Sequence, residues 1–190
     1  MKSNEIDKAR LCFDGRFQTH GLDFDETFSP VAKYASIHMA MFFIVQNRGE
    51  IYTADVPSTF LNSPVDVDVY MKHPDGFESH DGTVLKLNCA LYGMKQAPKL
   101  WNSVIDDFVI KNLEMTRFED DSCIYYRKEG ELFTIIILYI DGSNNRSSID
   151  GIMDALENHF NVKKLGPINN SYYLRMYMNV SEDRSAISKS

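Results

Sequence analysis

The chain has 190 residues, enough for a sizeable hydrophobic core in one domain or slightly more. Its hydrophobic content of 44% and aromatic content of 12% exclude a disordered protein, and its net charge of −7 argues against tight, unaided binding to nucleic acid. The three scattered cysteines indicate buried free thiols in a reducing compartment, with no spacing that suggests zinc.

The sequence gives no sign of a membrane segment. The amino-terminal residues lack the apolar region of a signal peptide, and no apolar run approaches the length of a transmembrane helix. We therefore expect a cytoplasmic or nuclear protein without a membrane partner.

The hydrophobic pattern predicts an α+β fold, an antiparallel sheet backed by helices. In the first half of the chain we expect an edge strand (6–17), a loop (20–30), a helix capped by Ser36 and ending near Gly49, a strand (50–56), and a turn into a short helix (57–62). In the second half we expect strands at 68–71 and 84–87, a helix from Pro98, a hairpin joining 123–127 to 132–140, a helix over 149–160, a strand over 172–180 and a polar tail from Ser181.

Two carboxylates stand at the carboxyl ends of predicted strands. Residues 132–140 are almost unbroken apolar and β-branched, which is typical of a strand buried on both faces, and the run ends in Asp141. Asp55 holds a similar place in the strand over 50–56. Each could simply cap the following turn, but two such carboxylates are also what a Mg²⁺ site needs.

A pair of cations lies near the amino-terminus. Lys8 and Arg10 are two residues apart, so on a strand they share one face. Two cations on one face could hold phosphates, although a solvated strand face is the more common explanation of such a pair.

Motifs along the chain resemble those of the reverse transcriptase domain of Ty1/copia-type retrotransposons, from Lys8 to about Met178. They occur in the family's order, and the long block at 91–98 makes the resemblance specific. The matching pieces are KARL (8–11), ETFSPVA (26–32), DV (55–56), FLN (60–62), VYM (69–71), PDGF (74–77), LYGMKQAP (91–98), YID (139–141) and LG (165–166).

The resemblance implies a right-hand polymerase fold, with palm and partial fingers. Residues 1–34 and about 62–98 would be fingers-like and the remainder palm, with no thumb or RNase H region in the chain. The implied partners are an RNA or DNA template–primer and a deoxynucleoside triphosphate (dNTP), and the implied cofactor is Mg²⁺, with Mn²⁺ as a substitute.

The resemblance also assigns roles to individual residues. Asp55 and Asp141 would be the catalytic metal ligands, assisted by the Val56 carbonyl. Lys8, Arg10, Phe60, Tyr92 and Gly93 would bind the nucleotide, with Phe60 selecting against a ribose 2′-hydroxyl. The primer end would be positioned by Tyr173, Leu174 and Met176.

The chain also departs from the family pattern. Gly142 follows Asp141 where the family has a second Asp and a returning strand, which indicates a deletion of about five residues. Such a deletion would leave the strand over 132–140 with an unpaired edge. Asp14, His38 and Arg175 replace, respectively, a cation, an Arg and a Gly.

Three hypotheses follow from these departures. The first is a decayed reverse transcriptase fragment without polymerase activity. The second is an enzyme with weak activity through Asp55 and Asp141 alone. The third is a non-enzymatic remnant that binds nucleic acid or a protein partner, including a second copy through the unpaired strand edge.

Overall fold

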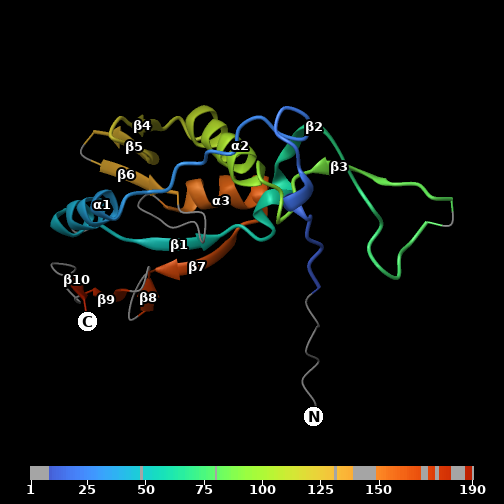
Figure 1. Cartoon of the computed structure of the whole chain (residues 1–190). Helices are drawn as coiled ribbons and strands as arrows, with labels where there is room; N and C mark the ends of the chain where they lie inside the picture. Colours follow the sequence, from blue (N-terminus) through green and yellow to red (C-terminus); the bar gives the residue numbers. More distant parts are fainter. Residues whose placement is uncertain are drawn as a thin grey trace, which may run out of the picture. The chain divides into compact units, whose positions relative to one another are not determined.

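The computed structural model describes residues 9–47, 49–79, 81–130, 132–138, 149–167, 171–173, 176–180 and 187–189 (Figure 1). The helices in these ranges are α1 (Tyr34–Gln46), α2 (Ala97–Lys111) and α3 (Ile149–Phe160), with short 3₁₀ turns η1 (Gly15–Phe17) and η2 (Thr59–Asn62). The strands are β1 (Tyr52–Asp55), β2 (Pro64–Met71), β3 (Leu85–Cys89), β4 (Thr116–Phe118), β5 (Asp121–Glu129), β6 (Leu132–Ile137), β7 (Lys163–Pro167), β8 (Ser171–Tyr173), β9 (Met176–Val180) and β10 (Ile187–Lys189).

These strands form small antiparallel sheets. β2 pairs with β3, β1 pairs with β7, β4 and β6 flank β5, and β8 and β10 flank β9. A mixture of helices and small antiparallel sheets is compatible with the predicted α+β class.

The chain folds as two compact units. Unit 1 comprises residues 1–29 and 58–104, and unit 2 comprises residues 30–57 and 105–190. α2 therefore contributes its first half to unit 1 and its second half to unit 2.

Unit 1 is built on the β2–β3 hairpin and the turn that leads into α2. Val69 pairs with Leu87 and is almost fully buried, and the chain then turns through Leu91 and Met94, which are buried as well. The amide of Ala90 donates to the carbonyl of Ser63, which ties the end of β3 to the start of β2. Burial of Leu91 and Met94 thus fixes the turn at residues 91–96.

Unit 2 packs α1 against the β5–β6 hairpin. α1 buries Ile37, Ala40, Met41 and Ile44, positions that share one face of a helix of period 3.6. The same cluster contains side chains of the sheet, including Ile124 of β5 and Ile137 of β6, which belong to residues paired directly across the strands.

β5 also contacts α2. Side chains alternate along a strand, so Tyr125 points away from the face that carries Ile124. The Tyr125 hydroxyl donates to Asp106 Oδ1 of α2 at 2.7 Å, and Arg117 of β4 donates to the same carboxylate from Nε at 3.0 Å. Burial and this hydrogen bond raise the pKa of Tyr125, while the bond to Asp106 raises that of Arg117.

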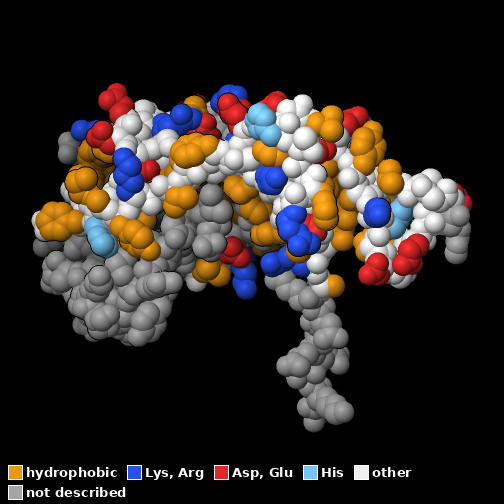
Figure 2. All heavy atoms as spheres, in the orientation of Figure 1, with side chains coloured by type: hydrophobic (Ala, Val, Ile, Leu, Met, Phe, Trp, Pro, Cys, Tyr) orange, Lys and Arg blue, Asp and Glu red, His pale blue; other side chains and the backbone are white. Residues whose placement is uncertain are grey.

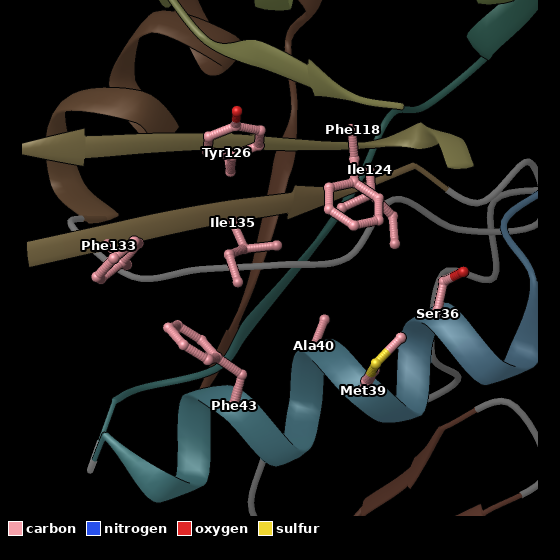
Figure 3. A pocket seen from close by; sticks show the side chains of 9 residues that line it. All are labelled: Ser36, Met39, Ala40, Phe43, Phe118, Ile124, Tyr126, Phe133 and Ile135. Carbon is pink, nitrogen blue, oxygen red and sulfur yellow. The ribbon is translucent and has the colours of Figure 1, made fainter. Parts of the chain in front are cut away.

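A gap remains between α1 and the sheet within unit 2. It has a volume of about 300 Å³ and lies between one face of α1 and side chains of β4, β5 and β6 (Figure 3). Phe43 and Phe133 meet edge to face at one part of its wall, and Phe118 and Tyr126 do so at another. The lining residues are Ser36, Met39, Ala40, Phe43, Phe118, Ile124, Tyr126, Phe133 and Ile135.

α1 carries large apolar side chains beyond its buried face. Met39 is 64% exposed and Phe42 is 65% exposed, and hydrophobic groups are visible on the surface over the α1 region (Figure 2). The helix is apolar on more than the stripe that faces the sheet.

Most predicted elements are confirmed, but the amino-terminal segment is not a strand. Of residues 6–17, those from 9 onward form only an isolated bridge at Cys12 and the 3₁₀ turn η1. Ser36 is not a helix cap, because α1 begins earlier and the amide of Ile37 already donates to Lys33. The backbone at the start of α1 is held by Asp121, a buried residue whose carboxylate accepts from the amide of Lys33 at 2.9 Å.

Two further predictions in the second half were wrong. β6 is not buried on both faces, because Phe133 is 36% exposed at the rim of the gap beside α1. The single strand predicted for 172–180 is a pair, β8 and β9, in which Tyr173 lies opposite Met176, and the tail after Ser181 contributes β10.

The cysteines are free, as predicted, but only Cys123 is buried, whereas Cys12 is exposed. Burial, reinforced by the negative charges of Asp121 and Asp106, raises the pKa of the Cys123 thiol from 9.0 to about 11. In the unfolded chain this thiol ionises near its ordinary pKa, so folding holds a proton that the unfolded state releases.

We therefore expect the free energy of unfolding to fall as the pH rises from about 9 to about 11. Below pH 9 the stabilisation is fully present, and roughly 2–3 kcal/mol of it should be lost across this window. Denaturant unfolding under reducing conditions at several pH values measures the slope. Cys123→Ala should make the slope shallower, with the remainder coming from Tyr125, whose raised pKa acts in the same direction. The matched Cys12→Ala should leave the slope unchanged, and equal slopes in the two variants would contradict the assignment.

No helix in the described part of the chain is both long and apolar enough to cross a membrane.

Candidate functional site

Asp55 stands at the carboxyl end of β1, as predicted. Its neighbours Ala54 and Val56 are buried, and the alternation along the strand leaves the Asp55 side chain exposed. Its partner across the β1–β7 pair is Lys163, and residues directly opposite each other in an antiparallel pair present their side chains on one face. The site residue therefore has an accessible carboxylate with a lysine as its register partner.

The second predicted carboxylate, Asp141, lies outside the described residues, as does Lys8. Among the residues that the structure describes, no three His, Cys, Asp or Glu side chains gather in a way that could hold a metal ion. Of the two predicted catalytic carboxylates, the structure therefore describes Asp55.

Three of the predicted nucleotide-binding residues come together in unit 1. The Arg10 guanidinium carbon lies 4.6 Å from the centre of the Tyr92 ring, and the Phe60 ring lies 4.6 Å from the same ring, tilted by 58°. Phe60 is supplied by η2 and Tyr92 by the turn after β3, so the grouping joins three distant segments. We name Arg10, Phe60, Tyr92 and Gly93 the Tyr92 cluster.

Gly93 has a backbone role in this cluster. Its φ of +96° is unfavourable for other residues, and a Cβ on it would lie 1.9 Å from the Phe13 carbonyl oxygen. A Cβ on Gly15 would in turn lie 2.1 Å from the Gly93 carbonyl oxygen. The amide of Phe13 donates to Tyr92 at 2.7 Å, so the two backbones pack directly against each other.

Two buried glutamines hold the same segments together, and the sequence analysis did not single them out. Gln18 Nε2 donates to Gln96 Oε1 at 2.9 Å, and Gln96 Nε2 donates to the Asp23 carbonyl at 2.8 Å. The Lys95 amide donates to Gln18 Oε1 at 2.8 Å, while Lys95 Nζ donates to the Gln18 carbonyl at 3.0 Å. Gln96 is fully buried and Gln18 nearly so, and both lie in segments without helix or strand periodicity.

Asp14, where the resembling family has a cation, has a local structural role. It accepts from the Arg16 amide at the start of η1, and its carboxylate bonds the Arg16 guanidinium at 2.7 Å and 2.9 Å. These hydrogen bonds lower the pKa of Asp14 and raise that of Arg16. An Asp at position 14, in place of the family's cation, therefore creates an exposed ion pair with Arg16 close to Arg10 in the sequence.

The predicted primer-positioning residues fall at a strand pair. Tyr173 ends β8 and Met176 begins β9, and the two lie opposite each other in the register. Leu174 lies outside the described residues. The structure thus brings Tyr173 and Met176 together along the backbone.

The chain matches the sequence profile described as reverse transcriptase (RNA-dependent DNA polymerase) over residues 2–187. The chain belongs to the reverse transcriptase family. This confirms the resemblance to the Ty1/copia type, because its relatives include Pol polyproteins of transposons.

Three relatives illustrate the similarity of this reverse transcriptase domain. It is 36% identical over 167 residues to the retrovirus-related Pol polyprotein from transposon TNT 1-94 of Nicotiana tabacum, covering 84% of the chain and 12% of that protein. It is 33% identical over 162 residues to the corresponding polyprotein from transposon RE1 of Arabidopsis thaliana, covering 82% of the chain and 11% of that protein. The transposon Ty1-BL Gag-Pol polyprotein of Saccharomyces cerevisiae is 24% identical over 167 residues, covering 85% of the chain and 9% of the polyprotein.

The reverse transcriptase domain thus spans about a tenth of the length of these curated relatives. No solved structure matches the chain.

Proposed function

We propose that the chain is the nucleotide- and primer-handling part of an RNA-directed DNA polymerase of the Ty1/copia type, impaired in catalysis by the loss of the second Asp after Asp141. The observation that carries this proposal is the gathering of Arg10, Phe60 and Tyr92 in a member of the reverse transcriptase family. Reverse transcriptases bind a nucleic acid template and a dNTP, which are the partners proposed here.

The Tyr92 cluster suits a dNTP. Arg10 offers a permanently charged guanidinium for the triphosphate, and Lys8 would add a second cation. The Phe60 ring is buried against Tyr92, and its bulk would exclude a ribose 2′-hydroxyl. Gly93, which has no side chain, lets the turn lie directly against the Phe13 backbone, which sets the position of Tyr92 in the cluster.

The fold units support the proposed division into fingers and palm. Of the parts proposed as fingers, unit 1 contains residues 1–29 of the range 1–34 and all of the segment at about 62–98, whereas residues 30–34 belong to unit 2. Unit 2 contains Asp55, Tyr173 and Met176, which belong to the part proposed as palm, and Tyr173 and Met176 would hold the primer end.

The donor chemistry fits a divalent metal ion. Asp55 is an exposed hard oxygen ligand, and Asp141 and the Val56 carbonyl would complete the protein's share. Mg²⁺, or Mn²⁺ in its place, when bound supplies a lowered pKa at the primer 3′-hydroxyl and a counter-charge for the reacting phosphate. Lys163 opposite Asp55 adds positive charge on that face. Because the second Asp is also missing, the site would carry less negative charge to hold the metal ion.

Primer extension on an RNA template tests the proposal. With Mg²⁺ and, in a second series, Mn²⁺, we expect the chain to extend a primer on the order of a thousandfold more slowly than the matching segment of the tobacco relative, because a charged ligand is missing from the site. Any residual extension should disappear in Asp55→Ala. Incorporation at a few per cent of the relative's rate would contradict the impairment.

Self-association through the unpaired edge of the strand that ends in Asp141 stays a prediction. Sedimentation of the purified chain over a range of concentrations would test it.

A further inference from the structure

We infer that Gln96 and Gln18 are positioning residues, which set the shape of the Tyr92 cluster through a buried pair of amides and do not contact the nucleotide. The effect on nucleotide binding rests on the proposed function, but the pairing of the two glutamines is defined by hydrogen bonds within unit 1.

Both polar groups of the Gln96 side chain are already engaged. Its carbonyl oxygen accepts from Gln18 Nε2, its amide nitrogen donates to the Asp23 carbonyl, and the side chain is fully buried. A buried amide needs such partners, because an unsatisfied one costs a desolvation penalty. Gln96 therefore acts on the site through the segments that it joins.

Those segments carry two of the three parts of the Tyr92 cluster, and Phe60 on η2 is the third. Gln18 follows the segment that carries Arg10 and Phe13, and Gln96 follows the turn that carries Tyr92 and Gly93. The two segments pack directly against each other, because the Gly93 Cα faces the Phe13 carbonyl and the Phe13 amide donates to the Tyr92 carbonyl. The amide pair clamps these segments at one end, and the Phe13–Tyr92 bond closes them at the other.

Lys95 makes the clamp specific for an amide at position 18. Its backbone amide donates to Gln18 Oε1, so this side chain must both accept here and donate to Gln96. Glutamine offers both functions, whereas Glu has no donor when ionised, and Met has no donor and only a weak sulfur acceptor. Loss of either glutamine should therefore let the Arg10 segment separate from the Tyr92 turn.

The first measurement is independent of nucleotide. In Gln96→Met, which keeps the length of the side chain but removes its hydrogen bonds, the Phe13 amide should exchange with solvent at least tenfold faster than in the parent chain. The Ala90 amide, bonded to Ser63 in the same unit, should change little and serves as the internal control. Unchanged exchange at Phe13 would overturn the inference.

The second measurement is the affinity for dATP carrying a fluorescent methylanthraniloyl group, in the presence of Mg²⁺. Gln96→Met and Gln18→Met should each weaken binding about tenfold, and the double variant should be no weaker than either, because one clamp is lost in all three. Val69→Ala, which loses core packing elsewhere in unit 1, should be destabilised yet bind like the parent.

The outcomes separate the two proposals. A parent chain that fails to bind the nucleotide, together with faster Phe13 exchange in Gln96→Met, would refute the proposed function and leave the clamp in place. Additive losses of affinity in the double variant would refute the clamp even where the nucleotide binds.

Discussion

Replacing Gly93 with alanine is expected to lower the free energy of unfolding by at least about 3 kcal/mol. The new Cβ would lie 1.9 Å from the Phe13 carbonyl oxygen, so the backbone of one segment would have to move away from the other. The positive φ adds about 1–2 kcal/mol of its own for a residue with a side chain. Denaturant unfolding followed by circular dichroism measures the loss.

Gly76→Ala is the matched control for this prediction. Gly76 also has a positive φ, +83°, but no atom lies within 4 Å of the position that its Cβ would occupy. Its substitution should cost only about 1 kcal/mol, which is the conformational part. Equal costs in the two variants would show that the close approach of Phe13 and Gly93 contributes nothing to stability.

Asp106→Ala is expected to cost about 2 kcal/mol of unfolding free energy. The substitution would leave the hydroxyl of the fully buried Tyr125 without its acceptor and would release Arg117 from the carboxylate. The buried Tyr125 hydroxyl would lose its acceptor, which costs about 1–3 kcal/mol, whereas the Arg117 side chain is 44% exposed and can be solvated by water.

The neighbouring residue provides the control for Asp106. Asp107 pairs with Lys111 at 2.8 Å one helical turn away, but both side chains are more than 60% exposed. Such surface pairs contribute about 0.5 kcal/mol or less, so Asp107→Ala should change stability little. A cost for Asp106→Ala as small as that for Asp107→Ala would contradict the role of the Tyr125–Asp106–Arg117 network.

Much of the fold could be predicted because the pattern of hydrophobic residues is local. α3 was predicted with the observed bounds, Ile149–Phe160, since its apolar positions recur with helical spacing. The first residue of α1 was missed because the backbone just before the helix, at Lys33, is bonded by Asp121, a residue 88 positions away. No pattern in the local sequence indicates such a contact. The β8–β9 pair was missed because its residues read as one apolar run.

The members of the Tyr92 cluster could be predicted from the sequence, whereas the glutamines that support them could not. The Tyr92 cluster came from motif resemblance, and the structure brings its described members together. Gln18 and Gln96 could not be singled out, because a buried glutamine looks like a surface glutamine until its partners from distant segments are known. The role of Asp55 stays a prediction, since Asp141 lies outside the described residues.

The surface of α1 has a practical consequence for handling the isolated chain. This helix has no Lys, Arg, Asp or Glu along Tyr34–Gln46, yet Met39 and Phe42 face solvent. Exposed apolar groups of this kind adhere to one another when molecules crowd together. Concentrated preparations will therefore tend to precipitate through α1, so the unfolding and binding experiments should be run dilute, with light scattering to confirm that the molecules stay apart.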